Sequence, residues 1–124
     1  MNSFYDFLEQ DRILYKGEHF FIYKDKFPVS PGHLLIISNK LRLDYFSLNK
    51  EEISAIDTMI LLATELIEQE YKPDGYNIGM NCKEAAGQSV MHFHMHIWPR
   101  YKGDVEDPRG GIRNCMPNGN YLKN

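Results

Sequence analysis

Histidines alternate with large apolar residues between Met91 and Arg100, and this pattern limits what the chain can fold into. The stretch is Met-His-Phe-His-Met-His-Ile-Trp-Pro-Arg. A period of two predicts a β-strand, because successive side chains on a strand point to opposite faces. The apolar residues would enter a core, while His92, His94 and His96 would share the other face. Three imidazoles in a row on a solvated face do little for packing, so they indicate a functional site.

Three roles are open for these histidines. Two of them, together with His33, could bind a metal ion, but all three cannot easily hold one ion. Zinc binds nitrogen at about 2.0–2.1 Å, whereas His92 and His96 would lie about 13 Å apart along a regular strand. A purely structural role is the second alternative. The third is chemistry on a phosphate, because a neutral imidazole is nucleophilic at physiological pH and a neighbouring imidazolium can donate a proton.

The composition fits one globular domain that spans residues 1–124. Hydrophobic residues make up 43% of the chain and charged residues 25%, which is ordinary for a folded protein. The net charge of −3 lacks the basic excess of a general nucleic-acid binder, so we expect no nucleic-acid partner. No apolar run approaches the length of a membrane span, and the acidic first residues lack a signal-peptide core. We therefore expect no membrane partner and a cytoplasmic location, with Cys82 and Cys115 reduced.

The rest of the chain predicts an α+β fold with about five strands. Gly17 lies in a turn that joins two short strands into a hairpin, and two prolines mark a loop over residues 25–32. A short segment, 1–11, precedes the hairpin, and an irregular tail, 104–124, ends the chain, where Ile112, Met116 and Tyr121 could act as anchors. The predicted strands are residues 13–16, 20–23, 33–38, 76–81 and the histidine stretch.

One long helix is predicted from Asn49 to Tyr71. Asn49 can accept hydrogen bonds from the first-turn amides, and Glu52 stands three residues later, as in a capping box. Apolar residues then recur at spacings of three and four, which gives the helix one broad face to pack on a sheet. Pro73 disfavours helical geometry at the residue before it, so the helix should end near Tyr71.

The flanks of the histidine stretch carry a family resemblance. Ala-Gly-Gln-Ser-Val precedes it at residues 86–90, and Pro-Arg-Tyr-Lys-Gly-Asp follows at residues 99–104. With His-x-His-x-His between them, the chain resembles the histidine triad (HIT) family, whose members bind and cleave nucleotides, from about Arg12 to its C-terminus. It is most similar to a bacterial branch related to dinucleoside polyphosphate hydrolases. The resemblance implies a HIT-like fold, with an antiparallel sheet under one long helix, and a homodimer formed through that helix and the strand after Pro73.

The resemblance also implies roles for four histidines. His94, the middle one of the triad, is the nucleophile that attacks the α-phosphorus of a nucleotide. His96 contacts the phosphate or the leaving-group oxygen. His92 is an orienting partner in a hydrogen-bonded network with His33. Cleavage in two steps through a phospho-histidine is easier than direct attack by water.

Five further residues match nucleotide-binding positions of the family. Ser89 resembles a hydroxyl that donates to a phosphate oxygen, and Asn81 resembles an amide that reaches the phosphate. Gln88 lies on the approach to the triad. Asp25 matches the position that binds the ribose hydroxyls, and Tyr23 is the first candidate for the base pocket. Additional candidates are Phe4, Tyr5 and Leu8 for the pocket walls, and Arg100, Lys102, Arg109 and Arg113 for extra phosphates.

The activity implied is hydrolysis at a nucleoside α-phosphate, with release of a nucleoside monophosphate. Diadenosine polyphosphates are the first candidate substrates and adenosine phosphoramidates the second. Nucleotidyl transfer belongs to relatives that have glutamine at the position of His96. A nucleotide-binding sensor or adaptor with little turnover is the alternative from a different class of function.

No cofactor is expected to be required. A divalent cation such as magnesium could accompany the phosphates of the substrate. Many HIT relatives complete a zinc site with a Cys-x-x-Cys pair where this chain has Ser3 and Asp6. We therefore expect no structural zinc.

Overall fold

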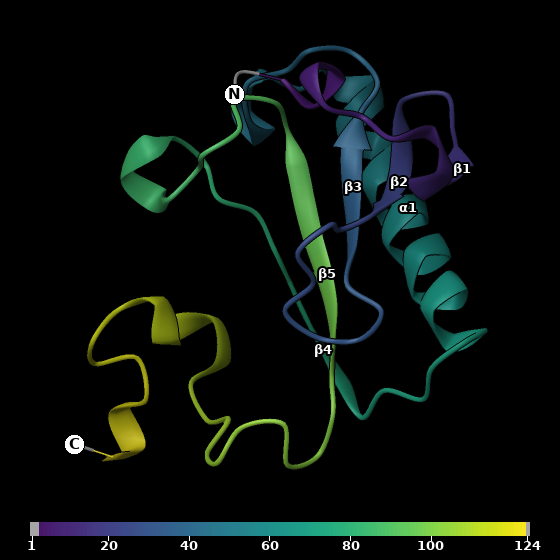
Figure 1. Ribbon diagram of the computed structural model, residues 1–124. Coiled ribbons are helices and arrows are strands. Elements are labelled where there is room, and N and C mark those ends of the chain that lie inside the picture. Colours follow the sequence, from purple (N-terminus) through teal and green to yellow (C-terminus); the bar gives the residue numbers. More distant parts are fainter. Residues whose placement is uncertain (1–2, 124) are drawn as a thin grey trace.

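The computed structural model describes residues 3–123, with a five-stranded antiparallel sheet at its centre (Figure 1). The strand order is β1-β2-β3-β5-β4, and one long helix accompanies the sheet, so the predicted α+β fold is confirmed. Within residues 3–123, no helix has the length and apolar character needed to cross a bilayer. The elements are β1 (Ile13–Lys16), β2 (Phe20–Lys24), β3 (Leu34–Ser38), α1 (Lys50–Glu68), β4 (Gly75–Gly79) and β5 (His94–Arg100).

The helix α1 begins where the sequence predicts. Asn49 Oδ1 accepts the Glu52 amide N–H at 2.8 Å, and the Glu52 carboxylate accepts the Asn49 amide N–H at 2.8 Å, which completes the capping box. The helix ends at Glu68, earlier than predicted. The Glu70 amide bonds to the carbonyl of Ile67, three residues back, which interrupts the four-residue hydrogen-bond ladder.

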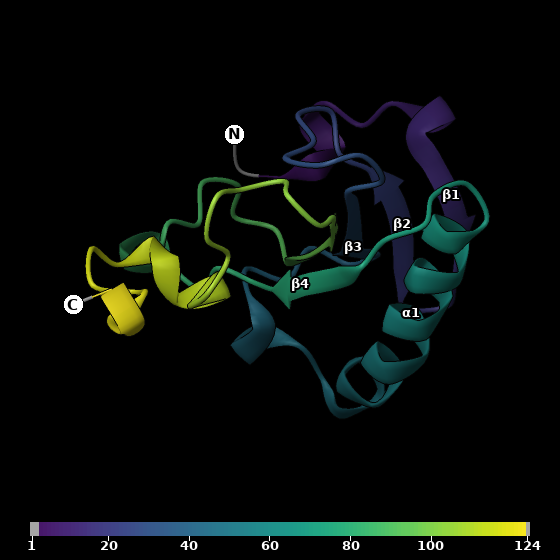
Figure 2. The ribbon, with the colours of Figure 1, turned by 90° about the horizontal axis from the view of Figure 1, so that it is seen from below.

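Alternate residues of the strands build two cores on opposite faces of the sheet. The face that packs against α1 includes Phe20, Ile22, Leu34, Ile36, Met95 and Ile97. The other face includes Phe21, Tyr23, Leu35 and Ile37, which pack against Phe4 of the N-terminal segment. Because α1 covers the first face (Figure 2), the side chains that project from the second are available to build a site.

The histidine strand starts later than predicted, at His94. Strand β3 pairs with β5 from Ile37 opposite His94 onward, and β3 ends at Ser38. The last contact of the β3 backbone with this segment's backbone is the hydrogen bond from the Ser38 amide to the Phe93 carbonyl, at 3.3 Å, and the chain bends at residues 90–92. The predicted strand is wrong at His92, which lies before β5 begins and is fully buried. Its ring still contacts Phe4, as the ring of His94 does, so both lie on the side of the sheet away from α1.

The tail after residue 104 lies on the β4 side of the molecule, away from α1 (Figures 1 and 2). It is less irregular than predicted, with 3₁₀ turns at Gly111–Cys115 and Tyr121–Lys123. Polar contacts stabilise it, because Arg113 Nε donates to the Gly119 carbonyl at 3.0 Å and its guanidinium lies over the Tyr121 ring. The apolar side chains expected as anchors stay more than half exposed: Ile112, Met116 and Tyr121.

Candidate active site

His94, the first residue of β5, is held in one tautomer. Its Nδ1 lies 2.9 Å from the backbone carbonyl of His92, and a carbonyl can only accept, so Nδ1 carries the proton. The lone pair is then on Nε2. Burial lowers the pKa of His94, although the His92 carbonyl and Asp25 favour the protonated ring. The arrangement is a neutral imidazole with a nucleophilic nitrogen at Nε2.

His33 and His96 form a hydrogen-bonded pair with a defined direction. The Val29 amide donates to His33 Nδ1 at 3.2 Å, so the proton of neutral His33 is on Nε2. That nitrogen lies 3.0 Å from His96 Nδ1, which must accept, so the proton of neutral His96 is on its own Nε2. Burial lowers the pKa of His33, and burial together with His94 and His33 lowers the pKa of His96 to about 4. His96 therefore presents an N–H donor next to His94, whose ring centroid is 5.1 Å away.

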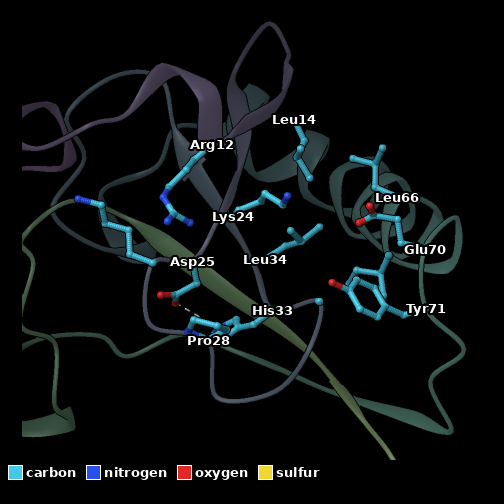
Figure 3. A pocket seen from close by; sticks show the side chains of 13 residues that line it. Arg12, Leu14, Lys24, Asp25, Pro28, His33, Leu34, Leu66, Glu70 and Tyr71 are labelled. Carbon is cyan, nitrogen blue, oxygen red and sulfur yellow. Dashed lines mark ion pairs between the residues drawn. The ribbon is translucent and has the colours of Figure 1, made fainter.

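Asp25 follows β2 and connects this pair to the loop over residues 25–32. Its Oδ2 lies 3.4 Å from Nε2 of His33, the contact drawn as a dashed line in Figure 3. Its Oδ1 accepts the Phe27 amide N–H at 2.8 Å, which fixes the orientation of the carboxylate. Asp25 raises the pKa of His33 against the larger effect of burial. The position predicted for ribose binding is therefore adjacent to the His33–His96 pair.

His92 does not bond with His33, contrary to the expectation from the resemblance. Its Nε2 donates to the carbonyl of Ser38 at 2.8 Å, and its Nδ1 accepts from Ser3 Oγ at 3.0 Å. His33 bonds with His96 instead. The N-terminal segment covers the His92 ring, with the ring centroids of Phe4 and Tyr5 at 5.7 and 5.1 Å from its own. Only its backbone carbonyl reaches the site.

A cavity of about 380 Å³ opens beside the two triad histidines of β5, and we call it the N-terminal cavity. It brings Tyr23, Asp25 and Ser89 together with these histidines, as the resemblance implied. The Tyr23 ring is buried and its hydroxyl accepts the Glu9 amide N–H at 3.1 Å, so the ring serves as a wall. The lining residues are Phe4, Phe7, Tyr23, Asp25, Lys26, Phe27, Leu35, Ser89, Val90, His94 and His96.

Sequence reasoning missed several walls of the N-terminal cavity. Leu35 pairs with Tyr23 across β2 and β3, so the alternation of the two strands was the signal that places both on one face. Phe27 is 84% exposed on its loop, and no pattern in the sequence marks it. Tyr5 and Leu8, two candidate walls, line a different hollow beside β1.

A second cavity, of about 410 Å³, lies on the other side of His96, and we call it the tail cavity. The predicted phosphate contact Asn81 lines this cavity and does not line the first. His96 lines both cavities, so it stands between them. The lining residues are Val29, His33, Gly79, Met80, Asn81, His96, Trp98, Gly111, Ile112 and Cys115.

Gln88 has a different place from the one expected. Its side chain is buried, with Oε1 accepting the Lys83 amide N–H at 2.7 Å and Nε2 donating to the carbonyls of Leu43 and Val90. These bonds occupy both ends of the amide and fix the loop before β5. Gln88 therefore lines neither cavity, and its contribution to the site is the position of Ser89.

The basic residues that follow the histidine strand are engaged elsewhere. None of the four candidates for extra phosphates is among the described residues that line the N-terminal cavity or the tail cavity. Lys102 is exposed on the surface. The three arginines donate hydrogen bonds to other residues. Arg100 bonds to Asp104 and Asn77, Arg109 bonds to Asp107, and Arg113 bonds to Gly119.

The metal alternative has a candidate group in Asp25, His33 and His96, whose potential ligand atoms lie within 4.8 Å of one another. A histidine that binds a metal through one nitrogen usually donates the N–H of the other to an acceptor. Here the outer nitrogen of His33, Nδ1, faces the N–H of Val29, which is itself a donor. This environment favours a proton on Nε2 and disfavours a metal ion there.

Comparisons with known proteins identify the family of this chain. The HIT domain matches residues 8–103. An uncharacterized 16.1 kDa HIT-like protein of Mycoplasma pneumoniae is 39% identical over 90 residues, which are 70% of this chain and 60% of that protein. A bis(5'-adenosyl)-triphosphatase of Saccharomyces cerevisiae is 33% identical over 100 residues, 80% of this chain and 48% of that protein.

The fold is also similar to that of a solved HIT family structure. The crystal structure of a HIT family protein from Bacillus anthracis has a TM-score of 0.70 and 31% identity, with 90% of this chain and 80% of that chain covered. The chain spans only about half to three fifths of the length of the two relatives compared by sequence. The sheet that holds the His33–His96 pair therefore has the fold of a solved HIT family protein. Because the HIT domain also matches most of the sequence, the chain belongs to the HIT family.

Proposed function

We propose that this protein hydrolyses nucleotides at a nucleoside α-phosphate through an intermediate on His94. The observation that carries the proposal is the hydrogen bond from His94 Nδ1 to the His92 carbonyl, because it leaves a lone pair on Nε2. This nitrogen belongs to a residue that lines a cavity of the size typical of small-molecule sites. Burial favours the neutral ring, which is the nucleophilic form.

The reaction proceeds in two displacements at phosphorus. In the first, His94 Nε2 attacks the α-phosphorus, a nitrogen–phosphorus bond forms and the bond to the leaving group breaks. The Nε2–H of His96 donates a hydrogen bond to the departing atom and stabilises its charge. In the second, water attacks the same phosphorus, the nitrogen–phosphorus bond breaks and the nucleoside monophosphate leaves. Over both steps the leaving group gains a proton of water and the phosphate gains its hydroxyl.

The N-terminal cavity is the proposed nucleoside site. Aromatic rings of Phe4, Tyr23 and Phe27 supply walls for a base, and the Asp25 carboxylate can accept hydrogen bonds from ribose hydroxyls. Ser89, exposed at the rim, can donate its hydroxyl to a phosphate oxygen.

Diadenosine polyphosphates are the first candidate substrates, and the name of the yeast relative, bis(5'-adenosyl)-triphosphatase, supports them. Adenosine phosphoramidates are the second. His96 occupies the third triad position, which favours hydrolysis over nucleotidyl transfer. A divalent cation such as magnesium can accompany the phosphates, and no cofactor is proposed.

A substrate panel tests the proposal. Diadenosine triphosphate, diadenosine tetraphosphate and an adenosine phosphoramidate are incubated with the protein, with His94→Ala and with His19→Ala, and the products are identified. Release of adenosine monophosphate by the wild type and by His19→Ala, but not by His94→Ala, is the expected result. His19 is a matched control because it lies beside the β1–β2 turn, outside both cavities. Nucleotide binding without turnover in all three proteins would indicate a sensor instead.

A further inference from the structure

The peptide unit that joins His92 to Phe93 makes a second hydrogen bond besides the one to the proposed nucleophile. Its carbonyl oxygen accepts from His94 Nδ1 at 2.9 Å, and its N–H donates to the backbone carbonyl of Arg42 at 2.6 Å. The unit is trans, so its carbonyl and its N–H point in opposite directions in one plane. A rotation of this plane that breaks the bond to Arg42 therefore also turns the carbonyl away from His94.

Arg42 lies in the loop between β3 and α1, and its side chain is bonded to the helix. Its Nε lies 3.0 and 3.2 Å from the two carboxylate oxygens of Glu52. Glu52 is in the first turn of α1 and is only 2% exposed. A hydrogen bond between charged groups is stronger than one between neutral groups. The bond to Glu52 therefore fixes Arg42, and with it the carbonyl that accepts the Phe93 N–H.

The two residues that follow Arg42 also hold the segment that leads into β5. The Leu43 carbonyl accepts from Gln88 Nε2, and the Asp44 carboxylate accepts from Lys83 Nζ at 3.2 Å. The loop thus contacts this segment at three points. Of the three, the contact from Arg42 involves the peptide next to His94.

The bonds through Arg42 form one directional chain from α1 to the proposed nucleophile. Glu52 accepts from the Arg42 side chain, and the Arg42 carbonyl accepts from the N–H of the 92–93 peptide. The carbonyl of the same peptide accepts from His94 Nδ1. Hydrogen bonds in a chain polarise one another, so donation by the N–H makes the carbonyl a better acceptor. A better acceptor keeps the proton on Nδ1 and the lone pair on Nε2.

We propose that Arg42, fixed by Glu52, is a positioning residue that orients the 92–93 peptide and so sets the tautomer of His94. Neither Arg42 nor Glu52 is among the described residues that line the N-terminal cavity or the tail cavity. Their effect on the reaction is therefore transmitted through the peptide. The inference rests on the proposed function, because it explains how His94 is kept ready to attack.

A double variant, Arg42→Met with Glu52→Gln, tests the inference. Arg42→Met alone would leave a buried carboxylate without its cation, which is strongly destabilising. The glutamine removes that charge and keeps an oxygen to accept the Asn49 amide N–H of the capping box. With the best-cleaved substrate of the adenosine panel, kcat should fall by about 10-fold, the size of one net hydrogen bond. KM should change less, because the walls of the N-terminal cavity are untouched.

Nitrogen NMR of isotopically labelled protein gives a readout that does not depend on turnover. It distinguishes a protonated ring nitrogen from an unprotonated one, and it is recorded at about pH 8, well above the ordinary histidine pKa. In the wild type, His94 should carry its proton on Nδ1 alone. In the double variant, a second population with the proton on Nε2 should appear.

Three single variants serve as controls. Asn49→Ala weakens the same helix start but leaves the bond between Arg42 and Glu52 in place. Lys83→Met removes another contact of the same loop. Both should keep the wild-type tautomer and kcat. Arg42→Lys should restore most of both, because its ammonium can also donate to the Glu52 carboxylate.

The outcomes separate this inference from the proposed function. A wild-type tautomer and kcat in the double variant would overturn the role of Arg42. The same losses in Asn49→Ala or Lys83→Met would show a general loosening, and no recovery in Arg42→Lys would show that the bond to Glu52 is not what matters. Either result would also overturn the inference. If the wild type cleaved none of the substrates, the proposed function would fall, while the NMR comparison would still decide whether Arg42 sets the tautomer.

Discussion

His94 and His96 stand two residues apart on one strand, and they differ in what their Nδ1 atoms meet. His94 Nδ1 faces a backbone carbonyl, which is an acceptor, whereas His96 Nδ1 faces the Nε2–H of His33, which is a donor. The Nε2 atoms of the two rings therefore differ as well: His94 Nε2 has a lone pair, and His96 Nε2 carries a proton. Identical side chains thus differ in protonation pattern because of their neighbours, and this difference underlies the roles we propose for them.

Replacing His94 by alanine should separate binding from turnover. The other groups of the N-terminal cavity can still hold the nucleotide, while the attacking nitrogen is lost. Turnover should fall by a factor of about 1,000 or more, which corresponds to roughly 4 kcal/mol of transition-state stabilisation. Rapid quench with a labelled substrate should trap an acid-labile, base-stable adduct in the wild type only. Near-normal turnover of His94→Ala would disprove the assignment.

The pH dependence should reflect the buried nucleophile. Burial lowers the pKa of His94, and protonation removes the lone pair that attacks. The value of kcat/KM should therefore stay level as the pH falls to about 6.5, the ordinary pKa of histidine, and decline only in more acidic solution. The profile is measured with a substrate that has no titrating group in this range. A decline with its midpoint above the ordinary histidine pKa would contradict the neutral, buried ring.

Removing the Asp25 carboxylate should weaken the binding of ribose nucleotides. A hydrogen bond to a charged group contributes about 1.5–3 kcal/mol, so Asp25→Ala should raise KM by about 10-fold or more. The effect on kcat should be smaller if the contact is equally strong in the ground and transition states. A 2'-deoxyribose substrate gives the comparison, because it has already lost one of the hydroxyls. If the wild type cleaved it as well as the ribose substrate, the carboxylate would not bind ribose.

At the level of elements, the site depends on where β5 begins. Its first residue, His94, lies opposite Ile37 of β3, and the chain bends just before it, with the His92 carbonyl 2.9 Å from His94 Nδ1. The loop before β5 is held by the buried amide of Gln88. The carbonyl of His92 is therefore available to accept the Nδ1–H of His94.

The capping box of α1 should contribute to stability without touching the site. Asn49→Ala removes the side-chain oxygen that accepts the Glu52 amide N–H, which should lower the free energy of unfolding by about 1 kcal/mol. Urea denaturation followed by circular dichroism measures the change. Lys50→Ala is the matched control, since Lys50 is an exposed first-turn residue with no part in the box. Equal effects of the two substitutions would remove the capping interpretation.

At the scale of the whole molecule, β4 is an edge strand of the sheet, with the tail packed near its last residue, Gly79. The strand order leaves β1 and β4 at its edges, and an unpaired strand edge invites association with another chain. On α1, Leu61 is 66% exposed and could be covered by a partner. These features support the homodimer that the resemblance implies, formed through α1 and β4.

The molecular mass of the protein in solution tests the proposed homodimer. Light scattering or sedimentation at micromolar concentration should give twice the mass of the chain. Leu61→Glu should shift the equilibrium toward the monomer, because it would bury an unpaired charge in the proposed interface. A monomeric wild type at this concentration would remove the proposal.

The sequence by itself determined the features that depend on neighbours along the chain. The capping box at Asn49 and the alternation from His94 onward were predictable, because periodicity and turn chemistry act over a few residues. The resemblance added Asp25, Tyr23 and Ser89, and the structure places them around one cavity.

Only the tertiary structure decided which residues meet across the sheet. His33 bonds with His96 and not with His92, because β3 lies beside β5 and ends before the chain reaches His92. Ile112 joins the tail cavity because the tail turns back over β4, a contact between segments far apart in sequence. Strand order and the path of the tail depend on packing of the whole chain, and a local pattern contains neither. The different hydrogen-bond partners of His94 and His96, like the second cavity, therefore came from the fold.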